Sequence, residues 1–263
     1  ARPCRRDTEM SYVPREILVD GDVLVYRFAH GEQTVVAWDP DFHTMHAYLE
    51  PAKVKLNTFL DVLRETLEAD EITIVLSDTD ANFRNDFCEE YKANRKTGKQ
   101  RPILFRALRE YFFEDYGATM IPTLEGDDVL GILGTEACSE ERIICTIDKD
   151  LGTVPGLHYN FDDEHGFAYR INESEARYNH LFQTLVGDST DNYRGCPGIG
   201  PVKAAKLLDA DPLADAWQDV VLPAYAKAGL GSGIALMYAR CAYILQSHNF
   251  NRKTQEITLW TPR

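Results

Sequence analysis

The stretch ILVDGD at residues 17–22 contains the pattern from which the fold class is predicted. A short, β-branched apolar run ends in two acids separated by a glycine, and an amphipathic stretch, residues 23–29, follows it. The same order returns at residues 72–78, where ITIVL leads into Ser-Asp, and at residues 143–148, where IICTI leads into Asp. Strands that alternate with helices predict an α/β domain with a mostly parallel central sheet flanked by helices.

The pattern changes after about residue 171, where helical periodicity takes over. We therefore predict an α/β catalytic domain over residues 16–171 and a helical subdomain over residues 172–263, preceded by a flexible polar arm at residues 1–15. The helices expected in the second part are 173–186, 201–208, 213–226 and 234–247.

The composition excludes several classes of protein. The 263 residues are 44% hydrophobic and 27% charged, which is the balance of a globular protein. The longest apolar runs are far too short to span a membrane, and no secretory leader is recognisable, so we expect no membrane partner. Six scattered cysteines without a C-x-x-C pair predict reduced thiols and a cytoplasmic location, without a disulfide scaffold or a zinc knuckle.

The net charge is −14, from 42 acidic and 28 basic side chains. An acidic protein repels nucleic acid, so charge alone favours a metabolic enzyme or an acidic-surface protein. The acids, however, gather where the predicted strands end. They are Asp20, Asp22, Asp78, Glu125, Asp127, Asp128, Asp148 and Asp150.

Because the carboxyl ends of parallel strands share one sheet edge, these acids are expected to converge in one cleft. Carboxylates packed together raise one another's pKa, and divalent cations remove that cost. A donor set made of oxygens alone suits Mg²⁺ or Mn²⁺ better than zinc. Any single one of these acids could instead be a turn former or a helix N-cap, and a phosphatase or a calcium-binding domain fits the pattern at this point.

A second motif begins at residues 185–192, LVGDSTDN, which add Asp188 and Asp191. It continues as GCPGIGPVKAAKLL, residues 195–208. Glycines on both sides of a tight turn expose backbone N–H groups next to a helix start, which makes a cradle for phosphate. The string predicts a DNA-binding helix–hairpin–helix at residues 188–208, whereas the weaker interpretation is a plain αα-hairpin.

A basic segment lies between Arg84 and Arg109, with eight Lys or Arg against three acids, a net charge of +5. Interleaved aromatic residues make it suitable for gripping a nucleic-acid strand, although a solvated helix face has a similar composition. The DNA contacts predicted here and in the hairpin are Arg84, Tyr91, Lys92, Arg95, Lys96, Lys99, Gly198, Gly200, Lys203 and Lys206.

Taken together, the motifs resemble the 5′-nuclease superfamily, the flap endonucleases and phage-type 5′-3′ exonucleases. The resemblance covers about residues 17–210. Its residues are, in order, Val19–Gly21, Asp78, Glu90–Arg95, Glu125–Asp128, Asp148–Asp150, Gly187–Asn192 and Gly198–Gly200.

The resemblance implies a PIN-like 5′-nuclease fold with a C-terminal helix–hairpin–helix (H3TH) subdomain. It implies an arch or clamp over residues 82–110, two Mg²⁺ ions that Mn²⁺ can replace, and a monovalent cation such as K⁺ at the hairpin. The expected partner is DNA with a 5′ end, nick or flap, then RNA–DNA hybrids and replication proteins. A phage enzyme of this kind would work in the cytoplasm of a bacterial host.

The chemistry expected is hydrolysis of a DNA phosphodiester near a 5′ end, leaving a 5′-phosphate and a 3′-hydroxyl. One ion is assigned to Asp20, Asp78, Glu125 and Asp127, and the other to Asp148, Asp150, Asp188 and Asp191, with Asp128 acting indirectly. The residues predicted to be catalytic are Lys92, Arg95, Asp20, Asp78 and Asp148. The role of Asp22 stays open, and the rivals are a PIN-like ribonuclease and a non-catalytic helix–hairpin–helix DNA-binding protein.

Overall fold

The computed structural model describes residues 12–96, 100–163, 166–210 and 215–262. Its main sheet has the strand order β4-β1-β5-β6-β7. The bounds are β1 (Arg15–Asp20), β4 (Glu71–Val75), β5 (Glu141–Cys145), β6 (Gly156–Tyr159) and β7 (Tyr169–Ile171). All neighbours are parallel except β6 and β7, so the prediction of a mostly parallel central sheet is confirmed.

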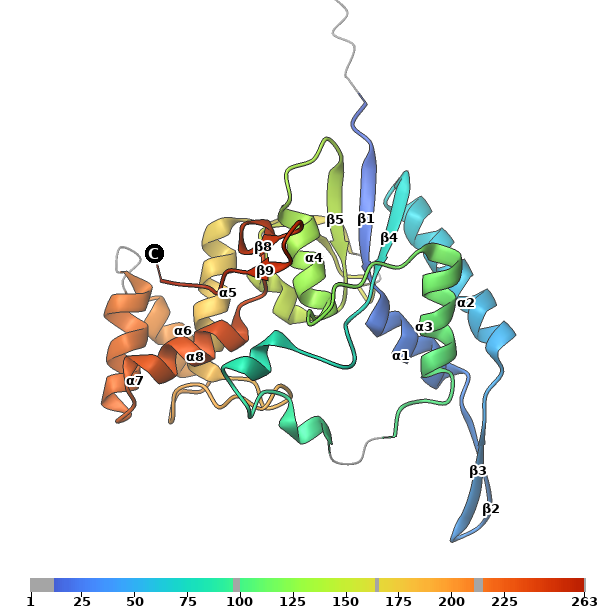
Figure 1. The fold of residues 1–263 in the computed structure, drawn as a ribbon, viewed down its shortest axis with the longest axis horizontal. Helices are drawn as coiled ribbons and strands as arrows, with labels where there is room; N and C mark the ends of the chain where they lie inside the picture. The colour runs from blue at the N-terminus through green and yellow to red at the C-terminus, as the bar shows by residue number, and fades with distance from the viewer. Residues whose placement is uncertain (1–11, 97–99, 164–165, 211–214, 263) are drawn as a thin grey trace, which may run out of the picture.

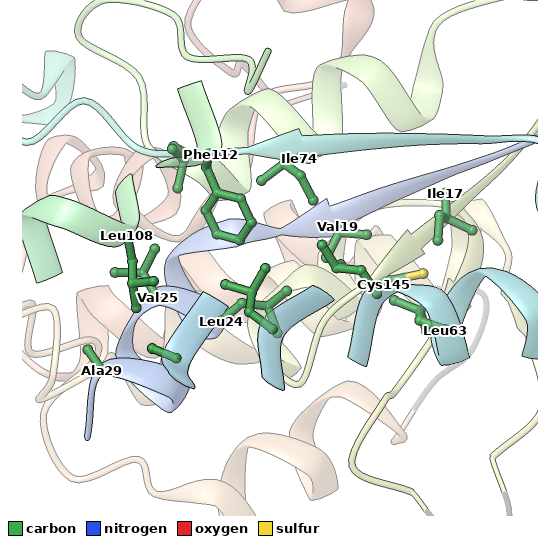
Figure 2. Close-up of a cluster of buried hydrophobic side chains, with 14 of the residues drawn as sticks. Ile17, Val19, Leu24, Val25, Ala29, Leu63, Ile74, Leu108, Phe112 and Cys145 are labelled. Atoms are coloured by element: carbon green, nitrogen blue, oxygen red, sulfur yellow. The ribbon is translucent and has the colours of Figure 1, made fainter. Parts of the chain in front are cut away.

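Helices cover both faces of this sheet (Figure 1). On one face lie α1 (Gly21–Gly31), α2 (Leu49–Thr66) and α3 (Phe105–Tyr116), and on the other lies α4 (Gly126–Thr135). The alternation of β1 explains the two layers, because Ile17 and Val19 point to the first face and Leu18 points to the second. Figure 2 shows the first layer, in which Ile17 and Val19 pack among residues of α1, α2 and α3.

Gly21 allows α1 to begin directly at the end of β1. A Cβ added at this position would lie 2.7 Å from the Val75 carbonyl oxygen and 2.7 Å from Ile74 Cγ2. Only glycine permits so close an approach to β4. The acids on either side of it, Asp20 and Asp22, are thereby held at the carboxyl edge of the sheet.

The C-terminal part is helical, with its own core of Leu181, Leu185, Trp217 and Tyr225. Its elements are α5 (Glu173–Val186), α6 (Pro201–Leu208), the π-helical η4 (Ala216–Val221), α7 (Leu222–Lys227) and α8 (Ser232–Ala242). The helix expected over 213–226 therefore has two pieces. The helix expected over 234–247 ends at Ala242, because Tyr243 is extended.

Smaller elements complete the chain. β2 (Thr34–Asp39) and β3 (Phe42–His46) form a separate hairpin that extends away from the body (Figure 1). Short 3₁₀ turns are η1 (Phe83–Asp86), η2 (Ala93–Lys96), η3 (Lys149–Thr153) and η5 (Ser247–Asn249), and β8 (Phe250–Asn251) pairs with β9 (Glu256–Ile257).

The predicted N-terminal arm needs a correction at its end. Residues 1–11 lie outside the described residues. Arg15 is already part of β1, and its guanidinium binds Glu141 at 2.8 Å and the Leu67 carbonyl at 2.6 Å. The ordered chain therefore starts before residue 16.

Over the described ranges, no single helix is long and apolar enough to cross a membrane. One bent pair, Ala216–Lys227 with Ser232–Ala242, meets the requirement by length and composition only.

Candidate active site

A cleft of about 820 Å³ lies at the carboxyl edge of the sheet. Seven of the nine acids predicted as metal ligands line it, and Asp22, Lys92 and Arg95 line it with them. The seven are Asp20, Glu125, Asp127, Asp148, Asp150, Asp188 and Asp191. The structure thus brings together acids from β1, α4, the turn after β5 and the loop after α5.

Asp20 is the most buried of the acids that line the cleft, at 5% exposed. Its carboxylate caps α1 by accepting a hydrogen bond from the Val23 N–H, at 3.2 Å, and accepts another from the Thr146 hydroxyl, at 2.8 Å. Burial, together with the charge of Asp22 and then of Asp148, raises the pKa of Asp20 to about 7. Such a carboxylate is short of positive charge.

Asp127 and Asp150 also have raised pKa values, for the same reasons as Asp20. Burial and the charges of Asp20 and Asp148 raise the pKa of Asp127 well above its ordinary value. Burial and the charge of Asp148 raise the pKa of Asp150 to about 6. Asp150 also accepts a hydrogen bond from Gln183 at 2.8 Å, which orients its carboxylate from α5.

Glu125 has the opposite electrostatic environment. Although burial raises its pKa, the charges of Lys92 and Arg84 outweigh burial and hold the pKa at about 2. Its Oε1 binds Lys92 Nζ, while its Oε2 accepts from Arg84 at 3.1 Å and from the Tyr91 hydroxyl at 2.8 Å. Glu125 is therefore ionised and fixed before any substrate binds.

The basic segment is joined to the loop after α5 through Asp191. This carboxylate accepts hydrogen bonds from Arg95 at 2.7 Å and from the Tyr91 hydroxyl at 2.9 Å, and Lys92 Nζ lies 3.4 Å from it. The Lys92 backbone, at φ 53°, also donates to the Asp191 carbonyl at 2.8 Å. Two predicted catalytic residues, Lys92 and Arg95, therefore face the cleft next to predicted ligands.

Asp78 does not belong to the cleft. It is absent from the cleft lining, and its carboxylate accepts hydrogen bonds from the Thr123 and Asp80 backbone N–H groups, both at 2.8 Å. Although burial raises the pKa of Asp78, these hydrogen bonds prevail and lower it. Asp78 is a turn former here, which corrects its predicted role as ligand and catalytic residue.

Arg84 lies elsewhere than predicted, whereas Asp128 lies behind the cleft, where it can act only indirectly, as expected. Asp128 is fully buried and pairs with Arg84 through two hydrogen bonds, of 2.6 and 2.8 Å. The Arg84 side chain is 2% exposed, so it cannot contact DNA. Tyr91, at 4% exposed, is likewise buried and cannot stack on a base. Lys96 ends η2, and Lys99 lies outside the described residues.

Asp22, whose role the sequence left open, lines the cleft with a partner of its own. Its Oδ1 binds Arg109 at 2.5 Å, and its Oδ2 accepts from the Ser77 N–H at 2.7 Å. Arg109, on α3, also donates to the Ser77 carbonyl at 2.7 Å. Arg109 thus holds a cleft acid from behind, a role that its place in a basic segment interpreted as DNA-facing did not predict.

The predicted hairpin lies between α5 and α6. Gly198 has φ 73°, a conformation that favours glycine, and Gly200 precedes α6, which begins at Pro201. Lys203 and Lys206 lie on the exposed side of α6. Lys203 Nζ also donates to the Gly198 carbonyl, at 3.1 Å.

The cleft fits a divalent cation by its chemistry. Its donors are carboxylate oxygens, the ligands that Mg²⁺ and Mn²⁺ prefer, and the raised pKa values of Asp20 and Asp127 show a shortage of positive charge. Within the described ranges, no three His, Cys, Asp or Glu side chains are already grouped to hold an ion. Lys92 instead binds Glu125, so an ion would have to compete with this ammonium group.

Residues 15–170 match the family described as 5′-3′ exonuclease, N-terminal resolvase-like domain. The chain belongs to this family. Two relatives extend the match over nearly the whole length, each 27% identical and covering 94% of this chain and 93% of the relative. They are the exodeoxyribonuclease of Enterobacteria phage T3 and the exonuclease of Escherichia phage T7. The predicted phage-type 5′-3′ exonuclease of the flap endonuclease superfamily is confirmed.

Solved structures show the same fold. A mutant of the T5 5′-exonuclease aligns with a TM-score of 0.57 at 15% identity, over 87% of this chain and 90% of that one. The T5 5′-exonuclease with bound zinc aligns with a TM-score of 0.56 at 19% identity, over 87% and 93%. The predicted 5′-nuclease fold is confirmed by these likenesses.

Proposed function

We propose that this exonuclease hydrolyses DNA phosphodiester bonds at or near 5′ ends with two divalent ions, leaving a 5′-phosphate and a 3′-hydroxyl. The observation that carries the proposal is the convergence of seven acids from four separate segments on one cleft. So many carboxylates in one place are stable only with compensating positive charge.

The ligands proposed for one ion are Asp20, Glu125 and Asp127, and for the other Asp148, Asp150, Asp188 and Asp191. Mg²⁺ is the expected ion, and Mn²⁺ should replace it. When bound, such ions supply an activated water and stabilise the leaving oxygen. Asp148 has a further structural reason for its place, because it caps η3 by accepting from the Asp150 N–H at 2.8 Å.

Lys92 and Arg95 are proposed to stabilise negative charge on the phosphoryl oxygens. Their cationic groups already lie at the cleft, where they bind Glu125 and Asp191. Lys92 is only 18% exposed in its side chain, so its charge is weakly screened by water. Although burial lowers the pKa of Lys92, the charges of Glu125 and then Asp191 raise it above its usual value and keep the ammonium charged.

DNA is the proposed substrate, held beside the cleft by the hairpin between α5 and α6. The T3 relative is named an exodeoxyribonuclease, and a T5 flap endonuclease has been solved with DNA and metal ions. We extend the proposal to RNA–DNA hybrids, to K⁺ at the hairpin and to a role in phage DNA replication.

Cleavage of end-labelled substrates tests the proposal. Asp148→Asn should lower the single-turnover rate at least about 100-fold, because it removes a charged ligand. Asp61→Asn, on the exposed side of α2, is the matched control and should retain the wild-type rate. The two-ion proposal is wrong if Asp148→Asn cuts at the wild-type rate.

The substrate panel separates the rival functions. It contains 5′-labelled duplex, nicked and flap DNA, an RNA–DNA hybrid and single-stranded RNA, each with Mg²⁺, Mn²⁺ or EDTA, and in K⁺ or Na⁺ buffer. Cutting of RNA alone would indicate a ribonuclease. Tight DNA binding without cutting in Mg²⁺ would indicate a non-catalytic module.

A further inference from the structure

Arg84 lies beneath the acid cleft, and all five of its N–H groups have acceptors. Nη1 donates to Glu125 at 3.1 Å and to Asp128 at 2.6 Å. Nη2 donates to Asp128 and to the Tyr243 carbonyl, both at 2.8 Å, and Nε donates to the Cys241 carbonyl at 3.1 Å. A fully satisfied guanidinium at this depth has one orientation only.

The partners of Arg84 come from distant parts of the chain. Glu125 and Asp128 begin α4, whereas Cys241 and Tyr243 belong to the C-terminal end of α8 in the helical part. Asp128 adds a further link, because it accepts from the Leu245 N–H at 3.0 Å. Arg84 itself lies in η1, at the start of the basic segment. Three regions of the molecule therefore meet at one side chain.

We propose that Arg84 is a positioning residue that fixes the Glu125 carboxylate in the cleft and links its position to the end of α8. The proposal rests on the proposed function, in which Glu125 binds a divalent ion. Arg84 and Tyr91 both bind Oε2 of Glu125, which turns Oε1 toward Lys92 and the cleft. A displacement of the α8 end would move the guanidinium and, with it, the carboxylate.

The alternative is that Arg84 only stabilises the fold. Removing it alone leaves Asp128 buried without its cation, which can unfold the protein whatever the role of Arg84. The double variant Arg84→Met/Asp128→Asn avoids this, because it removes both charges. The amide oxygen that replaces a carboxylate oxygen of Asp128 can still accept from the Leu245 N–H.

The matched control is Arg142→Met. Arg142 is partly buried and binds Glu16 at 2.7 Å and the Leu133 carbonyl at 2.8 Å, at the edge of the sheet where β1 and β5 begin. Arg142→Met also removes a largely buried ion pair, but it does so outside the cleft. Equilibrium unfolding in denaturant places the control and the double variant on one stability scale.

Three measurements then distinguish positioning from stability. The double variant should bind Mn²⁺ at least about tenfold more weakly by calorimetry, the low end for a group that orients a ligand. Its single-turnover rate at saturating DNA should fall by a similar factor, with DNA affinity in EDTA unchanged. In the metal-free protein, hydrogen exchange should speed up both at residues 126–129 and at residues 243–245.

The proposal is overturned if the double variant loses unfolding free energy but keeps the Mn²⁺ affinity, cleavage rate and exchange pattern of the control. If the wild type itself neither binds Mn²⁺ nor cuts DNA, the proposed function fails instead. Hydrogen exchange in the metal-free double variant then tests whether Arg84 links Glu125 to the end of α8. Unchanged exchange at residues 243–245 refutes this link, and faster exchange at both residues 126–129 and residues 243–245 supports it.

Discussion

The acid cleft and the α5–α6 hairpin both carry positive charge, but they use it differently. In and beneath the cleft, Arg84, Lys92, Arg95 and Arg109 each bind a carboxylate. At the hairpin, the lysines of α6 lie on the exposed side of the helix. The net charge of a segment therefore does not measure the positive charge that is available to bind phosphate. The basic segment has a net charge of +5, yet much of its positive charge is paired inside the protein.

The interiors beneath the two regions differ in the same way. Under the cleft, buried ions such as Arg84 and Asp128 are tolerated because they pair. The core of the helical part is apolar, and its buried His180 is kept neutral, since burial lowers the pKa of His180 to about 4. The first interior is organised by charge and the second by exclusion of charge.

The largest effect expected concerns Lys92, whose ammonium group binds two predicted ligands. Lys92→Ala should lower the single-turnover rate at saturating DNA by about 100-fold or more, because the Lys92 side chain is only 18% exposed and a cation shielded from water stabilises transition-state charge strongly. Rapid-quench kinetics with 5′-labelled DNA measure this rate. Lys55→Ala, on exposed α2, controls for the loss of one positive charge.

Lys92→Ala also tests whether the cations of the cleft act differently from the hairpin lysines. If Lys92→Ala weakens only DNA binding and leaves the saturated rate intact, Lys92 acts as the hairpin lysines are expected to act. The paired charge of the cleft would then be structural, and the catalytic role of Lys92 would be wrong.

The next effect is a pH dependence of stability from the helical part. His180 donates from Nε2 to the Ala239 carbonyl at 2.8 Å and packs against Trp260. Because its folded pKa, about 4, lies below the usual 6.5, the unfolded state takes up the proton first. The contribution of His180 to the free energy of unfolding should therefore fall as the pH drops, by about 2 kcal/mol between pH 7 and pH 5.

Acidification acts with the opposite sign in the cleft. The pKa of Asp20 is raised to about 7, so protonation below this pH relieves repulsion and favours the folded state. The difference between wild type and His180→Gln in denaturant curves at pH 7 and pH 5 isolates the helical contribution. An equal change in unfolding free energy between pH 7 and pH 5 in both proteins would show that His180 does not cause the predicted pH dependence.

The sequence predicted much of the site because strand ends are local signals. A buried run followed by acids marks the carboxyl edge of a sheet, and Asp20, Asp148 and Asp150 all lie there in one cleft. The turn and the start of α6 were equally predictable, because glycines next to Pro201 indicate a turn followed by a helix.

The rest of the site depended on where each side chain points in the folded protein, and a local sequence pattern does not contain this information. Asp127 and Asp128 are adjacent on α4, and successive helix residues point about 100° apart, so only one can face the cleft. Asp78 lies outside the cleft lining, and its carboxylate accepts a hydrogen bond from the Thr123 N–H. Arg84 is buried because it meets Asp128, 44 residues further along the chain.

The smallest effect expected is at the hairpin, and it concerns affinity. The double variant Lys203→Ala/Lys206→Ala should weaken DNA binding about tenfold near 0.1 M salt, because it removes two exposed lysines that are predicted to contact phosphate. The slope of log K against log salt should become shallower by about 2, and the saturated cleavage rate should stay at wild type. Fluorescence anisotropy in EDTA over a range of salt measures both quantities.

The control Lys53→Ala/Lys55→Ala, on α2, removes the same amount of positive charge at another place in the molecule. An equal loss of affinity and slope in that control would mean that the hairpin acts only through net charge, and the distinction between the two regions would fail.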